Sequence, residues 1–191
     1  MKIIDNEKLN KIPLISQNVD NTSNVAYKVA PPLEPMNSFS YIVGSAGSGK
    51  SSLFLAMLCS RPTKKKPNEP RFYYKYFDKI YLISSSLASL PLNKLNLNED
   101  RIFNKYSDSL MEQIVETERE DEENNNCLIV LDDVIKDIKK STFMSKCILN
   151  RRHILTNPEG EGCSGCSVWI LSQHYNELPL TFRVNASSIY V

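Results

Sequence analysis

Residues 44–51 have the sequence Gly44-Ser45-Ala46-Gly47-Ser48-Gly49-Lys50-Ser51, which matches the pattern G-x-x-x-x-G-K-[ST]. Glycines let the backbone turn tightly, so that several N–H groups can point at one spot and form an anion site. Lys50 adds a full positive charge beside these amides, and the Ser51 hydroxyl is a ligand that Mg²⁺ accepts. A helix that begins here adds the positive end of its dipole. The stretch therefore predicts a site for nucleotide phosphates.

The segments on either side of this motif have the order that it requires. Residues 39–43 form a short β-prone run, and residues 52–59, which contain neither Gly nor Pro, predict a buried helix. A strand, a glycine loop and a helix in succession are the context that supports this motif, so we expect a P-loop NTPase that binds ATP and Mg²⁺. The residues expected to bind the nucleotide are Gly44, Ser45, Ala46, Gly47, Ser48, Gly49, Lys50, Ser51 and Ser52.

Length and composition describe an ordinary globular chain. It has 191 residues, of which 41% are hydrophobic and 24% charged, enough for one domain with a substantial core. The formal net charge of +1 argues against a uniformly basic nucleic-acid binder, although local basic loops stay open. No apolar run approaches the roughly 18–20 residues that span a membrane, and the N-terminus lacks a signal-peptide core. We expect a protein without a membrane segment that is not secreted.

Two polar stretches flank the predicted strand–loop–helix unit. Residues 1–36 are Asn-rich and end in several prolines, so we expect an N-terminal extension, with the ATPase domain in residues 37–191. Residues 61–71 hold three prolines and a cluster of positive charges, which predicts an exposed basic loop. This loop is either a solvated connector, the interpretation we favour, or a contact with a phosphate backbone.

The cysteines include a single C-x-x-C pair, Cys163 and Cys166. A structural zinc site needs four ligands, and the two histidines, His153 and His174, do not have the spacing that would complete one. A turn with free thiols is therefore favoured over a metal site.

Four further segments predict strands that alternate with helices. They are residues 77–84, 127–133, 168–171 and 187–191, and the irregular connection 87–107 could hold a short strand near Ile102. Residues 107–115 predict a capped helix whose acidic tail, residues 116–123, is expected to be a solvated face. Residues 134–149 predict a helical connection. Alternating strands and helices indicate a parallel, right-handed α/β sheet.

Polar residues follow three of the predicted strands, where ligands of such sheets bind. Asp132 is expected to hold Mg²⁺ through water, while Ser51 binds the ion directly. Asp133 would orient or deprotonate the attacking water, and Gln173 would bond both water and γ-phosphate. The alternatives are a helix N-cap for Asp132, a structural carboxylate for Asp133 and an ordinary strand-end amide for Gln173.

Phosphoryl transfer also calls for an arginine near the transferred group. The candidates are Arg151, Arg152 and Arg183. The pair Arg151-Arg152, which precedes the strand that ends near Gln173, is the favoured choice.

The ordered set of motifs resembles a known family, the poxvirus-type genome-packaging ATPases of large DNA viruses and virophages, within the FtsK–HerA superfamily of P-loop motors. The matching residues are Gly44-Ser45-Ala46-Gly47-Ser48-Gly49-Lys50-Ser51, Leu128-Ile129-Val130-Leu131-Asp132-Asp133, Arg151-Arg152-His153, Trp169-Ile170-Leu171-Ser172-Gln173, Leu178-Pro179 and Arg183. The resemblance covers roughly residues 38–191. Many members carry Asp-Glu where this chain has Asp132-Asp133.

The resemblance implies a three-layer αβα sandwich with a mainly parallel sheet in the strand order 5-1-4-3-2, which places Gln173 between Ser51 and Asp132. It also implies a homo-oligomeric ring, a pentamer or hexamer, that drives double-stranded DNA into a viral capsid at its portal vertex. Arg151 or Arg152 would reach the hydrolysis site of the neighbouring subunit. The location would be the host-cell cytoplasm, the viral factory or the virion. Candidate DNA contacts are residues 61–71 and the lysines Lys136, Lys139, Lys140 and Lys146.

Two other functions fit a phosphate loop. A nucleoside or nucleotide kinase would share the loop, but such kinases usually carry an arginine-rich lid, and arginines are sparse here. A non-enzymatic nucleotide-binding adaptor is disfavoured by the intact set Lys50, Ser51, Asp132 and Asp133. A DNA-stimulated ATPase, a phosphate acceptor other than water, or binding without turnover would distinguish the three.

Overall fold

The computed structural model describes residues 29–60, 72–90, 92, 95, 97–121, 126–155 and 165–191. In chain order the strands and α-helices are β1 (Phe39–Val43), α1 (Lys50–Cys59), β2 (Lys79–Ser84), β3 (Ile102–Phe103), α2 (Asp108–Glu120), β4 (Cys127–Asp132), α3 (Ile135–Ile138), α4 (Thr142–Leu149), β5 (Cys166–Ser172), α5 (Leu180–Arg183) and β6 (Ser188–Tyr190). Short 3₁₀ turns cover Leu87–Ser89, Glu99–Arg101 and Tyr175–Glu177.

The six strands in the described part of the chain form one sheet in the order β3-β2-β4-β5-β1-β6, and every pair is parallel. The predicted α/β fold with a parallel sheet is therefore confirmed. The strand order differs from the predicted 5-1-4-3-2, which had five strands, because β3 adds an edge beside β2. The short strand suggested near Ile102 is therefore present as β3, but two residues give no pattern from which its place in the sheet could be predicted. Strand β5 lies between β1 and β4 and pairs with both.

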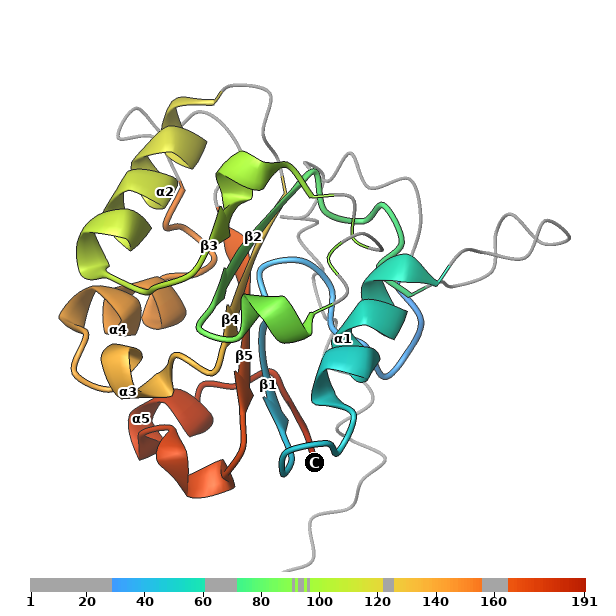
Figure 1. Cartoon of the computed structure of the whole chain (residues 1–191). Coiled ribbons are helices and arrows are strands. Elements are labelled where there is room, and N and C mark those ends of the chain that lie inside the picture. The colour runs from blue at the N-terminus through green and yellow to red at the C-terminus, as the bar shows by residue number, and fades with distance from the viewer. Residues whose placement is uncertain are drawn as a thin grey trace, which may run out of the picture.

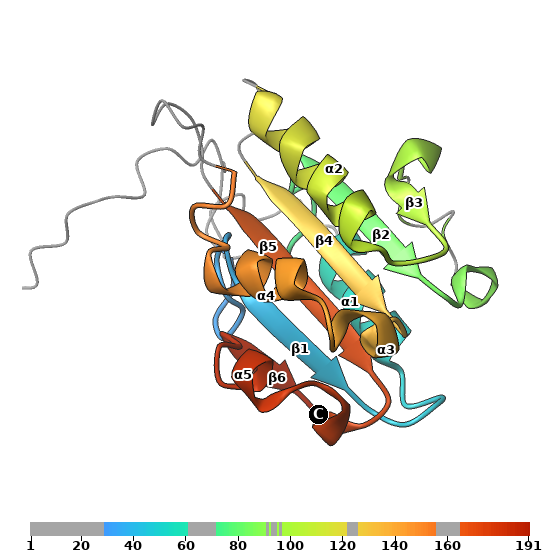
Figure 2. The same cartoon turned by 90° about the vertical axis from the view of Figure 1, so that its left-hand side faces the viewer.

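Helices cover both faces of the sheet (Figure 1). Helix α1 lies on one face, where Phe54, Leu55, Met57 and Leu58 are buried against the sheet. Helices α2, α3, α4 and α5 lie on the other face and contribute to a second apolar cluster. Figure 2 shows this second layer from in front, with α2 running alongside β4. Each fully buried aliphatic or aromatic side chain contributes about 1.5–3 kcal/mol to folding, so both layers hold the sheet in place.

The central strands β4 and β5 are buried along their whole length. A parallel strand covered by helices on both faces must be apolar throughout, which is why these segments show continuous apolar runs rather than alternation. Trp169 of β5 is fully buried and its ring meets Tyr73 edge-on, with 5.1 Å between centroids. The packing of β4 and β5 therefore fixes the positions of the residues that follow these strands.

The predicted helix over residues 134–149 is divided in two. Helix α3 ends at Ile138, and the Ser141 side chain caps α4 by accepting a hydrogen bond from the Met144 amide at 2.8 Å. A serine at this position satisfies an amide that has no partner within the helix, and so starts a new helix. The break lets the chain turn from the end of β4 onto the sheet face.

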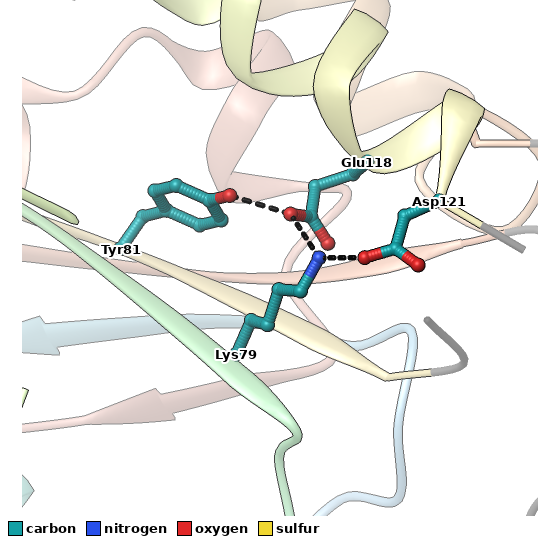
Figure 3. Close-up of polar contacts among 4 residues, drawn as sticks. All are labelled: Lys79, Tyr81, Glu118 and Asp121. Carbon is teal, nitrogen blue, oxygen red and sulfur yellow. Dashed lines mark hydrogen bonds and ion pairs between the residues drawn. The ribbon is translucent and has the colours of Figure 1, made fainter. Parts of the chain in front are cut away.

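A charged cluster joins the start of β2 to the end of α2 (Figure 3). Lys79 Nζ donates to Glu118 Oε1 at 3.0 Å and also to Asp121, and the Tyr81 hydroxyl donates to the same Glu118 oxygen at 2.5 Å. Only 2% of Glu118 is exposed. The prediction of a solvated acidic face is therefore wrong for Glu118, because this carboxylate turns inward to meet an ammonium and a phenol on the sheet.

Part of the predicted N-terminal extension packs on the domain. Leu33 and Met36 contact the α1-side cluster, and the Tyr73 hydroxyl donates to the Glu34 carbonyl at 2.7 Å. Residues 29–36 are thus attached to the core. Residues 1–28 lie outside the described part of the chain, as do the basic stretch 61–71 and Cys163.

Candidate functional site

The phosphate-binding motif forms a turn between β1 and α1 that requires its glycines. Gly47 and Gly49 have φ angles of 76° and 94°, a region that side chains with a Cβ rarely adopt. At Gly44 a Cβ would lie 2.3 Å from the Ser48 hydroxyl oxygen. Backbone conformation therefore explains the glycines at positions 47 and 49, whereas a side chain at position 44 would displace the Ser48 hydroxyl.

The N-terminus of α1 is suited to a negatively charged group. Gly49 occupies the N-cap position without a side-chain cap, and the first turn contains no acidic residue. The first amides of a helix have no partner within it, and the helix dipole makes this end positive. The loop and the first turn, which includes Ser51 and Ser52, can therefore hold phosphate oxygens.

Lys50 bends back over the loop. Its ammonium donates to the carbonyl oxygens of Gly44 at 2.7 Å and Ser45 at 3.1 Å. A phosphate oxygen is a stronger acceptor for an ammonium than a neutral carbonyl. The Lys50 ammonium is thus held where it can give up its hydrogen bonds to these carbonyls and donate to a phosphate oxygen instead.

Two consecutive backbone carbonyls at the end of β5 accept hydrogen bonds from the residues that directly follow β1 and β4. The Gly44 amide donates to the Ser172 carbonyl at 3.1 Å, and the Asp133 amide lies 3.4 Å from the Leu171 carbonyl. Because β5 lies between β1 and β4, the residues after these three strands meet at one edge of the sheet. The structure therefore brings the phosphate loop, the two aspartates and Gln173 to the same edge.

Asp132 is the last residue of β4 and is only 3% exposed. Its Oδ2 accepts hydrogen bonds from Ser84 Oγ at 2.9 Å and Ser86 Oγ at 3.4 Å. Burial raises the pKa of Asp132 above its usual value, whereas the Ser84 hydrogen bond and the charge of Lys50 oppose this rise. Helix α3 has Val134 at its N-cap position without a side-chain cap, so Asp132 does not cap it. Together with Ser51, this carboxylate could hold Mg²⁺, which prefers oxygen ligands.

Asp133 has a positive φ angle, which is uncommon for a residue other than glycine. Its φ is 54°, its side chain is exposed, and its carbonyl accepts a hydrogen bond from Ser85 Oγ at 3.0 Å. Aspartate tolerates this left-handed region better than most residues. The turn ends β4 one residue earlier than predicted and directs the chain away from the sheet.

Gln173 is exposed directly after β5. The backbone around it is held by side chains, since the Ser172 hydroxyl lies 2.9 Å from Glu177 Oε2 and accepts from the His174 amide at 3.2 Å. The Tyr41 hydroxyl in β1 bonds the carbonyls of His174 and Tyr175 at 3.0 and 3.1 Å. These contacts position Gln173 beside the phosphate loop.

The arginine pair lies at the opposite edge of the sheet. The Arg151 carbonyl accepts from the Cys166 amide at 2.8 Å, at the start of β5, and the strand's seven residues separate it from Gln173 by roughly 20 Å. Arg151 also donates to the Ile148 carbonyl at 3.0 Å, whereas Arg152 is exposed. The structure does not bring either arginine to the phosphate loop of its own chain.

Arg183 is the candidate arginine nearest to the end of β5. Its guanidinium lies 4.6 Å from the centre of the Tyr175 ring, and Nη1 donates to Asn176 Oδ1 at 3.3 Å. Tyr175 and Asn176 follow Gln173 within three residues. The sequence favoured the pair 151–152 over Arg183, whereas in the structure Arg183 is the candidate that contacts the residues after Gln173.

The cysteines and lysines have less specific surroundings. Cys166 is a buried strand residue, opposite Cys127 in the β4–β5 register, and has a free thiol. Among the described residues, no group of three or more His, Cys, Asp or Glu could hold a metal ion.

The candidate DNA contacts in the described part of the chain are exposed; they are Lys136, Lys139, Lys140 and Lys146.

Sequence reasoning missed the residues that support this site. Ser84, Ser85 and Ser86 contact the two aspartates, and Tyr41 and Glu177 hold the segment after β5. The run of three serines after a strand was visible as a turn, but its partners are 46 or more residues away. No local pattern connects such residues.

The chain matches no protein-family model, and no curated protein matches it. In the described part of the chain, no helix has both the length and the apolar character to cross a membrane. The fold and the geometry of this site are therefore the basis for any functional assignment.

Proposed function

We propose that the protein is a Mg²⁺-dependent ATPase. The observation that carries this proposal is the pair of hydrogen bonds from Gly44 and Asp133 to consecutive carbonyls of β5, which unites a phosphate-binding turn with two carboxylates at one edge of the sheet. In ATP hydrolysis the protein must bind the triphosphate, orient a water and stabilise charge on the transferred phosphoryl group. The residues at this edge supply a group for each task.

Each side chain has a role that follows from its place. Lys50 exchanges its loop carbonyls for phosphate oxygens, and the free amides of the α1 N-terminus bind the same charge. Mg²⁺ held by Ser51 and, through water, by Asp132 would neutralise charge on the β- and γ-phosphates. Asp133 is exposed, so its carboxylate can orient the attacking water and accept its proton. Gln173 donates its amide to the γ-phosphate or the water.

We further propose that hydrolysis drives double-stranded DNA into a viral capsid, in a homo-oligomeric ring. The ordered motifs and their resemblance to packaging ATPases support this part of the proposal. The position of Arg151 and Arg152 agrees with an intersubunit site, because these arginines lie at the edge remote from their own phosphate loop. This function would place the protein in the host-cell cytoplasm or the viral factory.

Steady-state ATP hydrolysis, measured with and without double-stranded DNA, tests the proposal, with light scattering to follow assembly. We expect Mg²⁺-dependent phosphate release that rises with DNA and with ring formation. Transfer of phosphate to a nucleoside acceptor without DNA would instead identify a kinase. Nucleotide binding without turnover in the assembled, DNA-bound protein would identify an adaptor. Either result would overturn the proposed function.

A further inference from the structure

Three consecutive serines, Ser84 to Ser86, lie at the last position of β2 and in the turn that follows it, beside the end of β4. Ser84 and Asp132 are register partners in the parallel β2–β4 pair, so the serine run lies alongside both aspartates. The Ser86 amide donates to Ser84 Oγ at 3.1 Å, which closes a tight turn. Two of the three hydroxyls, those of Ser84 and Ser86, bond the Asp132 carboxylate, and the Ser85 hydroxyl bonds the Asp133 carbonyl.

Ser84 and Ser86 contact the Asp132 side chain. Both hydroxyls donate to the same carboxylate oxygen, Oδ2, at 2.9 and 3.4 Å. Neither of these two described serines donates to the other oxygen, Oδ1. Ser84 is fully buried and Asp132 nearly so. A buried carboxylate bonded on one oxygen by two fixed donors has little rotational freedom, so its orientation is set before any ligand arrives.

Ser85 contacts Asp133 through the backbone. Its hydroxyl donates to the Asp133 carbonyl at 3.0 Å, and its amide lies 3.4 Å from the Asp132 carbonyl. Asp133 has a φ of 54°, a conformation that costs free energy and persists only where its surroundings hold it. Ser85 is one of the groups that hold it.

We propose that Ser84, Ser85 and Ser86 are positioning residues of the ATPase site, with two separable tasks. Ser84 and Ser86 orient Asp132 so that Oδ1 is the oxygen offered to a magnesium-bound water. Ser85 holds the turn that presents the Asp133 carboxylate. This inference rests on the proposed ATPase function and adds residues that the motif pattern does not contain.

The two tasks predict different defects. In Ser86→Ala, and more strongly in the Ser84→Ala/Ser86→Ala double variant, we expect Mg²⁺ affinity of the nucleotide complex to fall by about tenfold or more, the usual effect of losing a group that orients a metal ligand. Titration of Mg²⁺ into protein with a fluorescent ATP analogue measures this directly, without turnover. Analogue binding in EDTA should be unchanged. In Ser85→Ala we expect unchanged Mg²⁺ affinity and KM with a several-fold lower kcat.

Ser145→Ala is the matched control, since this hydroxyl also donates to a backbone carbonyl, Ser141, at 3.0 Å, but on α4. It should leave both measurements at the wild-type values. Because Ser84 is buried, thermal unfolding of every variant checks that it folds; Ser86, which is only half-buried, gives the test if Ser84→Ala does not. Ser86→Thr retains a hydroxyl and should restore Mg²⁺ affinity.

Wild-type Mg²⁺ affinity in the folded Ser86→Ala protein and wild-type kcat in Ser85→Ala would overturn the inference while leaving the proposed ATPase intact. If the wild-type protein itself shows no Mg²⁺-dependent nucleotide binding, the proposed function fails and this inference fails with it. Equal loss of Mg²⁺ affinity in all three serine variants would contradict the separation of tasks.

Discussion

The backbone amide of Gly44, the first residue of the phosphate loop, donates to the carbonyl of Ser172, the last residue of β5, at 3.1 Å. These residues are far apart in sequence, and the bond fixes the distance between the loop and the segment that carries Gln173. A phosphate bound by the loop would therefore lie beside Gln173 without a rearrangement of the backbone. The proposed site is organised before ligand binding, which is the arrangement that favours catalysis by positioned dipoles.

Replacement of Lys50 tests the phosphate loop. Lys50→Ala should weaken ATP binding by roughly a hundredfold, about 3 kcal/mol, because it removes charge-assisted hydrogen bonds to phosphate. Isothermal titration with ATP and Mg²⁺ measures the change. Lys139→Ala, which removes an exposed lysine beyond α3, is the control and should bind as the wild type does. Equal affinity in Lys50→Ala would place the nucleotide elsewhere.

Replacement of Asp133 tests the water-activating role. Asp133→Asn should bind ATP normally but lose hydrolysis by 10²–10⁴-fold, the typical contribution of a general base. Asparagine also tolerates a positive φ, so the turn should be retained. Single-turnover hydrolysis and nucleotide titration separate the two effects. Retained turnover would show that another group activates the water.

Mixed assemblies test whether an arginine acts between subunits. Arg152 is exposed and lies at the edge remote from its own phosphate loop. Arg152→Ala and Asp133→Asn should each be inactive alone, whereas a mixture should recover activity, because some sites then combine an intact Asp133 with a neighbour's intact Arg152. Activity of the mixture, measured against mixing ratio, checks this. A mixture as inactive as its components would exclude Arg152, and the same experiment with Arg183→Ala would then test the arginine near Gln173.

The cluster around Glu118 should matter for stability rather than for the site. Lys79→Met removes the ammonium beside a buried carboxylate and should lower the free energy of unfolding by about 3 kcal/mol. Tyr81→Phe removes one hydrogen bond to Glu118 and should cost about 1 kcal/mol. Urea denaturation at neutral pH compares the two with the wild type. A loss below 0.5 kcal/mol (about the scatter of ordinary surface changes) in Lys79→Met would show that the cluster is not stabilising.

Stability should also fall in alkaline solution. Burial lowers the pKa of Lys79, but its hydrogen bonds to Asp121 and Glu118 outweigh this and raise it above 10.5. Burial and Glu118 also raise the pKa of Tyr81 above 10.0. A pKa raised on folding gives stability that is present below the unfolded pKa and is lost as the pH passes upward through the folded value. Urea titrations between about pH 8 and 11.5 should show this decline, and Tyr81→Phe should decline less steeply.

Much of the site could be predicted from sequence because its signals are local. The glycine pattern that ends at Lys50, the apolar run that ends at Asp132, and the strand that precedes Gln173 each depend on neighbours in the chain. Strand ends of a parallel sheet share one edge, so these separate signals could be combined without coordinates. The α/β class and the parallel sheet followed from the same alternation of strands and helices.

The sequence by itself determined the phosphate turn and the polar residues that follow the strands, since φ preferences, charge and periodicity belong to short segments. Only the tertiary structure decided that Glu118 turns inward, that Arg183 contacts Tyr175 and Asn176 beyond the end of β5, and that residues 84–86 hold the aspartates. These outcomes depend on the register between strands and on the packing of α2 and α5 onto the sheet. Such contacts join residues that no local pattern relates, because their free energy arises only when the whole sheet has formed.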